Sequence, residues 1–157
     1  MQQLAQDVVE RARQSPDQVA VVDGTGSHTV RRIVEHANRV AESLADGLDG
    51  PPTVLVQADN TWRTLAAAVA VGLRGGLIAV ISGHATRSEY ELALEDIRPD
   101  AVLAAPATLD SWQVGEEFAD ATEVLEGWQL RLAASGATRG MERWNGGCVV
   151  AMTSGST

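Results

Sequence analysis

The chain ends in five small residues, four of which carry a hydroxyl group: Thr153, Ser154, Gly155, Ser156 and Thr157. They follow an apolar run, Cys148 to Met152, that is typical of a buried strand. Glycine adopts the positive φ that turns successive backbone N–H groups toward one anion, and the hydroxyl groups add donors. A loop of this kind after a strand of an α/β domain predicts phosphate binding. The alternative is an unstructured tail.

A second glycine-containing stretch, GTGSHT at 24–29, lies between a predicted strand and a predicted helix. It has the first two glycines of a dinucleotide-binding fingerprint, but Thr29 stands where the third glycine belongs, and no clear acidic ribose ligand follows. We therefore favour a hairpin turn at this position.

Three polar residues, Asp59, Asn60 and Thr61, lie where a predicted parallel strand ends and a helix begins. Open α/β sheets bind ligands at this edge. The same residues are typical of a helix N-cap, which is the interpretation we favour.

The remaining residues that could bind a metal, stack on a base or act as a nucleophile are predicted to be structural. The three histidines, His28, His36 and His84, are too scattered for a metal site and are expected at the surface. The four tryptophans have no regular interval, which favours core or loop anchors over a base-stacking platform: Trp62, Trp112, Trp128 and Trp144. The single cysteine, Cys148, excludes an internal disulfide and is expected to be a buried, inert thiol.

Length and composition indicate one ordinary globular domain. The chain has 157 residues, 45% of them hydrophobic and 21% charged. Its formal charge of −9 disfavours nucleic acid as a partner. No apolar run approaches the roughly 18 residues of a membrane helix, and the N-terminus does not resemble a signal peptide. We expect a cytoplasmic protein that binds neither nucleic acid nor membrane.

Two helices and a strand-turn-strand segment are predicted before residue 50. Leu4, Val8 and Ala12 are spaced as one face of a first helix, and VAVVD at 19–23 is a strand. Thr29 is a plausible N-cap for a helix whose apolar residues repeat every three or four positions as far as Leu48.

Strands and helices alternate in the middle of the chain. Strands are predicted at 53–58, 77–81 and 101–105, and the helices between them end at Gly75-Gly76 and before Pro99, the second opening with a Thr86/Glu89 capping box. Strands that are apolar on both faces and separated by helices predict parallel pairing. The fold class is therefore α/β, a Rossmann-like parallel sheet flanked by helices. A receiver-type domain shares this pattern but needs a lysine, and all twelve basic residues are arginines.

The last third is predicted to hold short strands at 123–127 and 128–134, an exposed loop at 135–147, and the buried strand at 148–152. No internal repeat or long linker divides the chain, so residues 1–157 are expected to form one unit.

In this order and spacing, the chain resembles the start of the adenylate-forming enzymes, a superfamily that includes acyl-CoA and aryl-CoA synthetases, luciferases and peptide-synthetase adenylation domains. The stretch VAVVDGTGSHTVRRIVEHANRVAESLA is similar to their opening strand, turn and helix, and LEDIRPDAVLA to a later helix ending in Asp-x-x-Pro before a strand. AMTSGST resembles the beginning of their phosphate loop, which continues Gly-x-Pro-Lys-Gly. Five residues of the helix that begins after Thr29 match the usual pattern: Glu35, Ala37, Asn38, Arg39 and Leu44.

The sequence departs from the family pattern in three places. Val30 replaces an aromatic residue, Ile81-Ser82-Gly83 replaces a proline-containing turn, and Met152 replaces an aromatic residue before the loop. The peptide-synthetase signature after the second strand of the unit is missing, which favours the CoA-ligase branch.

The resemblance implies an acid-thiol ligase that activates a carboxylic acid with ATP and Mg²⁺ as an acyl adenylate and transfers it to CoA. It implies that Thr153, Ser154, Gly155, Ser156 and Thr157 bind ATP phosphates, and that the catalytic lysines, magnesium ligands and acyl pocket come after residue 157. We thus expect residues 1–157 to be the N-terminal subdomain of a larger enzyme, ending inside its phosphate loop at an artificial boundary, a proteolytic nick or a gene split, and to be inactive alone. The alternative is a degenerate, non-catalytic member that serves as a binding module.

Overall fold

The computed structural model describes residues 1–134 and 149–151. The predicted loop at 135–147, Trp144, Cys148 and the five residues from Thr153 to Thr157 lie outside the described residues. The described elements, in chain order, are α1 (Gln2–Gln14), β1 (Val19–Asp23), β2 (Gly26–Thr29), α2 (Val30–Gly47), β3 (Thr53–Ala58), α3 (Trp62–Leu73), β4 (Leu77–Ser82), α4 (Arg87–Ile97), β5 (Ala101–Ala104), α5 (Pro106–Trp112), β6 (Thr122–Val124), β7 (Trp128–Leu132) and β8 (Val149–Ala151).

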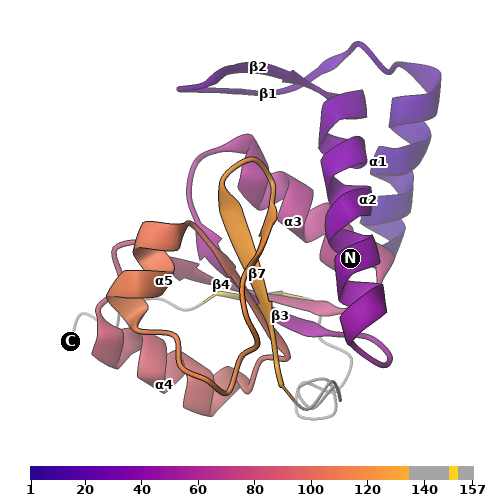
Figure 1. The fold of residues 1–157 in the computed structure, drawn as a ribbon. Coiled ribbons are helices and arrows are strands. Elements are labelled where there is room, and N and C mark those ends of the chain that lie inside the picture. The colour runs from indigo at the N-terminus through magenta and orange to yellow at the C-terminus, as the bar shows by residue number, and fades with distance from the viewer. Residues whose placement is uncertain (135–148, 152–157) are drawn as a thin grey trace.

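The main sheet is mostly parallel and has the strand order β6-β7-β5-β3-β4-β8 (Figure 1). β3 lies at its centre, with Val54 paired to Ile78 of β4 on one side and to Ala101 of β5 on the other. β8 extends the parallel part beyond β4, whereas β7 and β6 add an antiparallel edge beside β5. The predicted β-α-β-α-β unit is therefore confirmed.

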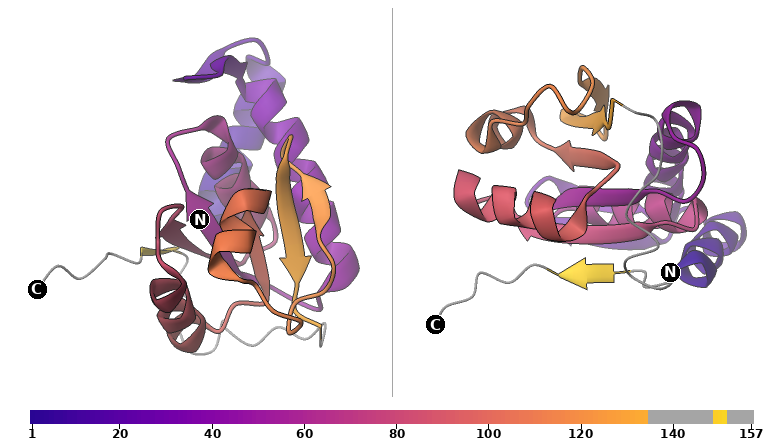
Figure 2. Two further views of the ribbon diagram at one scale, coloured as in Figure 1. Left: turned by 60° about the vertical axis from the view of Figure 1, so that its left-hand side comes forward. Right: turned by 90° about the horizontal axis from the view of Figure 1, so that it is seen from below.

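The sheet separates two hydrophobic clusters, because successive side chains of a strand point to opposite faces. Val54 and Val56 of β3 pack with α1, α2 and α3, whereas Leu55 packs with α4 and α5. The same alternation holds in β5, where Leu103 belongs to the first cluster and Val102 to the second. The views in Figure 2 show α4 and α5 on the side of the sheet away from α1.

The second cluster is centred on a stacked pair of aromatic rings. Tyr90 of α4 and Trp112 of α5 lie 5.1 Å apart between ring centroids, and the Trp112 indole donates a hydrogen bond to the Ala85 carbonyl. Burial raises the pKa of Tyr90 above its usual range, so its hydroxyl is neutral. The described tryptophans Trp62, Trp112 and Trp128 are all buried, which confirms their prediction as anchors.

The β1–β2 hairpin is antiparallel and is joined by a turn in which Gly26 has a φ of 126°. Only glycine adopts this conformation at no steric cost, which explains its place in the turn. The GTGSHT stretch is thus a hairpin turn, as favoured over the dinucleotide fingerprint.

The predicted helix caps are present. Thr29 accepts a hydrogen bond from the Arg32 amide at the start of α2. Thr86 and Glu89 form the capping box of α4, with the Thr86 amide donating to the Glu89 carboxylate over 2.7 Å. These local signals fix where the chain leaves the strands and enters the helices.

The strand predicted at 123–127 ends at Val124, and three other details also differ from the sequence predictions. The buried stripe of α1 is centred on Ala5, and Leu4 is 57% exposed, because α1 packs on α3 at Gly72, where an added Cβ would lie 2.9 Å from the Ala5 Cβ. Helix α5 was not predicted, although Pro106 at its first position is a recognisable start signal. β8 was expected to be buried, but Val149 is 49% exposed because β8 has a described neighbour, β4, on one side only.

The segment after α5 is held by one arginine. The Arg131 guanidinium on β7 donates hydrogen bonds to the carbonyls of Val114, Gly115, Phe118 and Ala119. A planar fork with several donors can satisfy these acceptors together, which a lysine ammonium could not do with the same geometry.

Candidate active site

The carboxyl ends of the parallel strands form one edge of the sheet, and a groove opens there. The chain leaves β3 toward α3 on one face, and leaves β4 and β5 toward α4 and α5 on the other face. Open α/β sheets bind ligands in the crevice that such a divergence creates. The groove has a volume of about 570 Å³, and its lining residues come from the ends of β3 and β4 and from α5: Gln57, Ala58, Asp59, Asn60, Gly83, His84, Ala107, Thr108 and Ser111.

Gln57 fixes the spacing of the strand ends at this groove. Its side-chain oxygen accepts a hydrogen bond from the Ala105 amide over 2.9 Å and so joins the ends of β3 and β5. On the other side, a Cβ added at Gly83 would lie 2.9 Å from the Gln57 amide nitrogen. Glycine at position 83 therefore allows the turn after β4 to approach the Gln57 side chain.

The turn from β3 into α3 forms one wall of the groove. One carboxylate oxygen of Asp59 accepts hydrogen bonds from the Thr61 amide, the Thr61 hydroxyl and the Thr64 hydroxyl at 3.0, 2.7 and 3.0 Å. Thr61 is the N-cap residue of α3 and accepts from the Arg63 amide. The favoured N-cap interpretation is confirmed, and Asp59 and Asn60 also line the groove.

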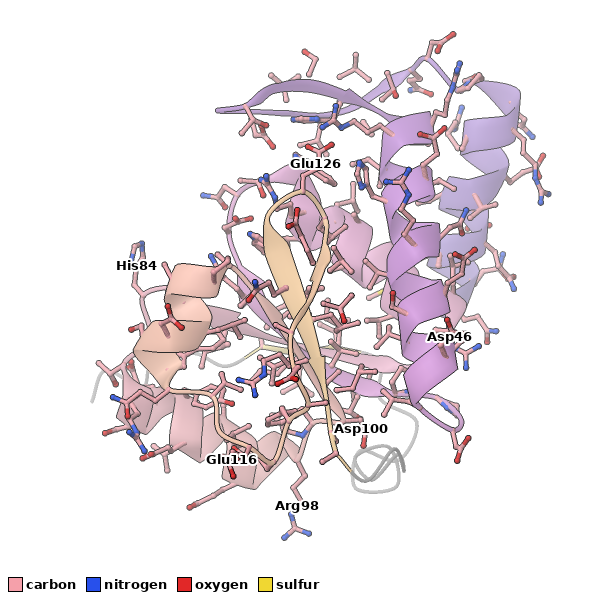
Figure 3. The ribbon with its side chains drawn as sticks, viewed as in Figure 1. Asp46, His84, Arg98, Asp100, Glu116 and Glu126 are labelled. Atoms are coloured by element: carbon pink, nitrogen blue, oxygen red, sulfur yellow. The ribbon has the colours of Figure 1, made fainter. Side chains whose placement is uncertain are left out.

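The groove offers amide, hydroxyl and imidazole groups and one carboxylate. His84, at the end of β4 near α5, is exposed, and Figure 3 shows its side chain directed away from the body of the protein. No arginine is among the described lining residues, and the sequence has no lysine. This chemistry suits a ligand that carries amide or hydroxyl groups better than it suits a phosphate.

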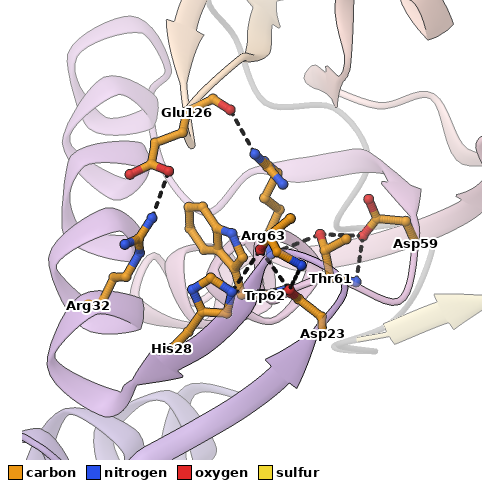
Figure 4. A network of polar contacts seen from close by, with 9 residues as sticks. Asp23, His28, Arg32, Asp59, Thr61, Trp62, Arg63 and Glu126 are labelled. Carbon is orange, nitrogen blue, oxygen red and sulfur yellow. Dashed lines mark hydrogen bonds and ion pairs between the residues drawn. The ribbon is translucent and has the colours of Figure 1, made fainter.

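A polar network around Trp62 joins the β3–α3 turn to the rest of the protein (Figure 4). One oxygen of Asp23, at the end of β1, accepts a hydrogen bond from the Trp62 amide over 2.8 Å. The other oxygen accepts from the Thr25 amide and hydroxyl at 2.8 and 2.6 Å and lies 3.1 Å from His28 Nε2. These hydrogen bonds, chiefly that from the Thr25 hydroxyl, hold the pKa of Asp23 well below its usual range.

The same network reaches the β6–β7 turn. Glu126 accepts a hydrogen bond from Arg32 of α2 over 2.7 Å, and Arg63 of α3 donates to the carbonyls of Leu125 and Glu126. Leu125 and Glu126 have φ values of 48° and 50°, which non-glycine residues rarely adopt. The Arg63 contacts hold this turn against its conformational cost.

The Trp62 ring is enclosed by cationic and imidazole groups. The guanidinium carbons of Arg32 and Arg63 lie 5.3 and 5.0 Å from its ring centroid, which is within cation–π range. The rings of His28 and His36 lie 5.6 and 4.7 Å away. The prediction that these two histidines are at the surface is wrong: they are 4% and 8% exposed, because the hairpin and α2 both pack against Trp62.

His36 should make the stability of the fold sensitive to pH. Burial lowers its pKa, Arg39 and Arg32 lower it further, and Glu126, 3.3 Å away, opposes them. A lowered pKa means that the folded state binds the proton less readily than the unfolded state, so protonation of His36 favours unfolding. The contribution of neutral His36 to the free energy of unfolding is complete above the unfolded pKa and is lost as the pH falls through the folded pKa. We expect the free energy of unfolding to fall as pH is lowered from about 7.5 to about 5.5, and to fall less in His36→Gln.

Urea denaturation of both proteins across this pH range measures the effect. Equal slopes of unfolding free energy against pH in the two proteins would contradict it. Replacing the exposed His84 by glutamine provides the matched control, because that change removes a histidine outside the network.

Within residues 1–134 and 149–151, no group of three or more histidine, cysteine, aspartate or glutamate side chains could hold a metal ion. Over the same residues, no helix has the length and apolar character needed to cross a bilayer.

The sequence matches a model of the AMP-binding enzyme family over residues 8–157. The chain belongs to the AMP-binding enzyme family. This match confirms the resemblance to adenylate-forming enzymes.

Among curated relatives, the chain is 34% identical over 112 residues to a salicylyl-CoA synthase / salicylate adenylyltransferase of Streptomyces sp, covering 68% of this chain and 20% of that protein. It is 28% identical over 149 residues to a linear gramicidin synthase of Brevibacillus parabrevis, covering 94% of this chain and 3% of that protein.

Solved structures agree on the fold. The nonribosomal peptide synthetase FmoA3 superposes with a TM-score of 0.66 and 24% identity, over 72% of this chain and 13% of that chain. The chain therefore spans only a small part of the AMP-binding enzymes that it matches.

The described structure tests only part of the predicted site. The five-residue phosphate loop remains a prediction, but β8, which precedes it, pairs in parallel with β4 through Ala151 and Val80, so β8 ends at the same edge as the groove. The sequence reasoning missed Gln57, His84, Thr108 and Ser111 as lining residues. Gln57 lies near the end of one predicted strand and His84 shortly after another, and these positions could have identified them as lining residues.

Proposed function

We propose that the protein carrying this chain is an acid-thiol ligase. It joins a carboxylate to the α-phosphorus of ATP, giving an acyl adenylate and pyrophosphate, and the thiol of CoA then displaces AMP to give the thioester. Membership of the AMP-binding enzyme family over residues 8–157 is the observation that carries this proposal. The similarity to a salicylyl-CoA synthase favours CoA as the acceptor.

In this proposal, residues 1–157 act as an N-terminal α/β subdomain and contribute the start of the phosphate loop. Thr153, Ser154, Ser156 and Thr157 supply hydroxyl donors and Gly155 supplies the backbone geometry for holding the ATP phosphates. The step depends on positioning the carboxylate and neutralising charge. Mg²⁺ would lower the charge on the phosphates, and its ligands, like the catalytic lysines, are expected outside these residues.

The groove at the sheet edge is proposed to hold the amide-bearing pantetheine arm of CoA. Its lining offers hydrogen-bond donors and acceptors from Gln57, Asn60, Thr108 and Ser111, and its small residues Ala58 and Ala107 leave room for a thin chain. The absence of arginine among the described lining residues argues against the phosphate end of CoA at this place.

A carrier-protein thiol is the second candidate acceptor. It is favoured by the similarity to the linear gramicidin synthase, which extends over 94% of this chain. A phosphopantetheine arm on a carrier protein presents the same amides to the groove, so the two candidates differ in what the arm is attached to.

The function is tested in two steps with the protein that carries this chain. First, exchange of labelled pyrophosphate into ATP is measured with a panel of carboxylic acids, aryl acids and amino acids included. Second, CoA and a phosphopantetheinylated carrier protein are each added with the best acid, and thioesters are detected by mass spectrometry. We expect acid-dependent exchange and an acyl-CoA product. Exchange without acyl-CoA would replace the CoA proposal by the carrier alternative, and no exchange with any acid would overturn adenylation.

A further inference from the structure

The start of α3, which follows the β3–α3 turn, is anchored to the β6–β7 turn through Arg63 and to the hairpin through Trp62. Within the turn, Asp59 holds Thr61 and Thr64. The Trp62 amide, at the first position of α3, donates instead to Asp23, which lies 39 residues earlier in the chain. The first N–H groups of a helix have no partner within the helix, so Asp23 supplies the partner that α3 itself cannot supply.

Asp23 is built to stay charged and oriented in this contact. Its side chain is 2% exposed, and its second oxygen is occupied by the Thr25 amide, the Thr25 hydroxyl and His28. A carboxylate at the N-terminal end of a helix is also favoured by the helix dipole. The His28 contact is best made by the ring with its proton on Nε2, because Nδ1 is buried without a partner.

The hydrogen bond from Trp62 to Asp23 can fix the start of α3 because the Trp62 side chain is also buried. Trp62 is 1% exposed, and its ring lies among side chains of the hairpin, α2 and α3. Its amide contacts Asp23 and its ring contacts His28, both in the hairpin, so Trp62 and the hairpin move together. The two residues before Thr61, Asp59 and Asn60, form the groove wall and are therefore fixed relative to the hairpin.

We propose that Asp23 is a positioning residue for the thiol acceptor: by capping α3 at Trp62, it sets the place of the groove wall at Asp59 and Asn60. This inference rests on the proposed function of the groove. Asp23 contacts no substrate and acts through Trp62 and the turn. Its effect belongs to thioester formation, whereas adenylation does not use the groove.

The test uses Asp23→Asn in the protein that carries this chain. Asparagine presents an NH₂ group where the carboxylate accepts hydrogen bonds, so the Thr25 and Trp62 contacts cannot all be kept. We expect the KM for CoA to rise about tenfold with acid-dependent pyrophosphate exchange within about twofold of wild type. By hydrogen exchange in NMR, the Trp62 amide should exchange about tenfold faster.

Two further variants separate positioning from loss of folding. Asp17→Asn removes the same charge from an exposed residue that pairs with Arg31 over 2.6 Å, and should change neither value. Thr25→Val removes one hydrogen bond to Asp23 and should raise the KM for CoA in the same direction by a smaller factor, in case Asp23→Asn does not fold.

Each outcome decides between the proposals. A faster Trp62 amide with an unchanged KM for CoA would overturn the positioning role alone, as would a pyrophosphate exchange that falls in parallel with CoA use. An unchanged Trp62 amide would show that Asp23 does not hold the turn. A wild-type protein that performs pyrophosphate exchange but forms neither acyl-CoA nor a carrier-bound thioester would overturn both the acid-thiol ligase function and this inference.

Discussion

Replacing Gly155 with valine is expected to lower acid-dependent pyrophosphate exchange by at least about 100-fold. An anion nest needs a residue that accepts positive φ, and a β-branched side chain excludes that conformation. With glycine at this position, the N–H donors are expected to face the negative charge of the transferring phosphate. Losing them removes preorganised donors that stabilise the transition state. Steady-state exchange at saturating acid, with ATP varied, measures the change.

Gly24→Val is the matched control for this prediction. A Cβ added at Gly24 meets no atom within 4 Å, and the residue lies in the β1–β2 turn. Its exchange rate should stay within about twofold of wild type, because surface changes of this kind have small effects on folding. A Gly155→Val protein that binds ATP and exchanges pyrophosphate normally would favour the unstructured-tail alternative for residues 153–157.

Replacing Trp62 with alanine is expected to lower the free energy of unfolding by about 3–5 kcal/mol. The substitution leaves a large cavity in the first cluster and removes the contacts of the ring with Arg32, Arg63, His28 and His36. The hairpin would keep its hydrogen bond to the backbone at position 62 but lose the surface on which it packs. Urea denaturation followed by circular dichroism measures the loss.

Leu92→Ala removes an apolar side chain of α4 that is 59% exposed, and it should change the unfolding free energy by no more than about 0.5 kcal/mol. A Trp62→Ala protein that is destabilised by no more than this control would mean that the network around Trp62 does not hold the hairpin to the rest of the fold.

The elements that were predicted correctly from the sequence are those whose signals lie in neighbouring residues. The capping box of Thr86 and Glu89, the N-cap residues Thr29 and Thr61, and the apolar strands of the β-α-β-α-β unit were all predicted from neighbouring residues. Parallel pairing followed because a helix separates each strand from the next. Helix α5 was missed because it has only 7 residues and no side chain caps its start.

The site was predictable only in part, since its contacts join distant residues. Asp59, Asn60 and Thr61 were recognised at a strand end, where both a cap and a ligand site were possible. The contact of Asp23 with Trp62 and that of Arg32 with Glu126 join residues 39 and 94 positions apart, and no local pattern announces them. The same reason explains why His28 and His36 were expected at the surface: their burial depends on the hairpin folding over α3.

The division of the interior by the sheet makes the protein energetically modular. Trp62 belongs to one cluster and Trp112 to the other, with the strands between them. Substitutions whose side chains share no partner usually add in their effect on unfolding. The packing on one face of the sheet can therefore change without a compensating change in the packing on the other face, whereas the groove, which is lined from both faces, couples them.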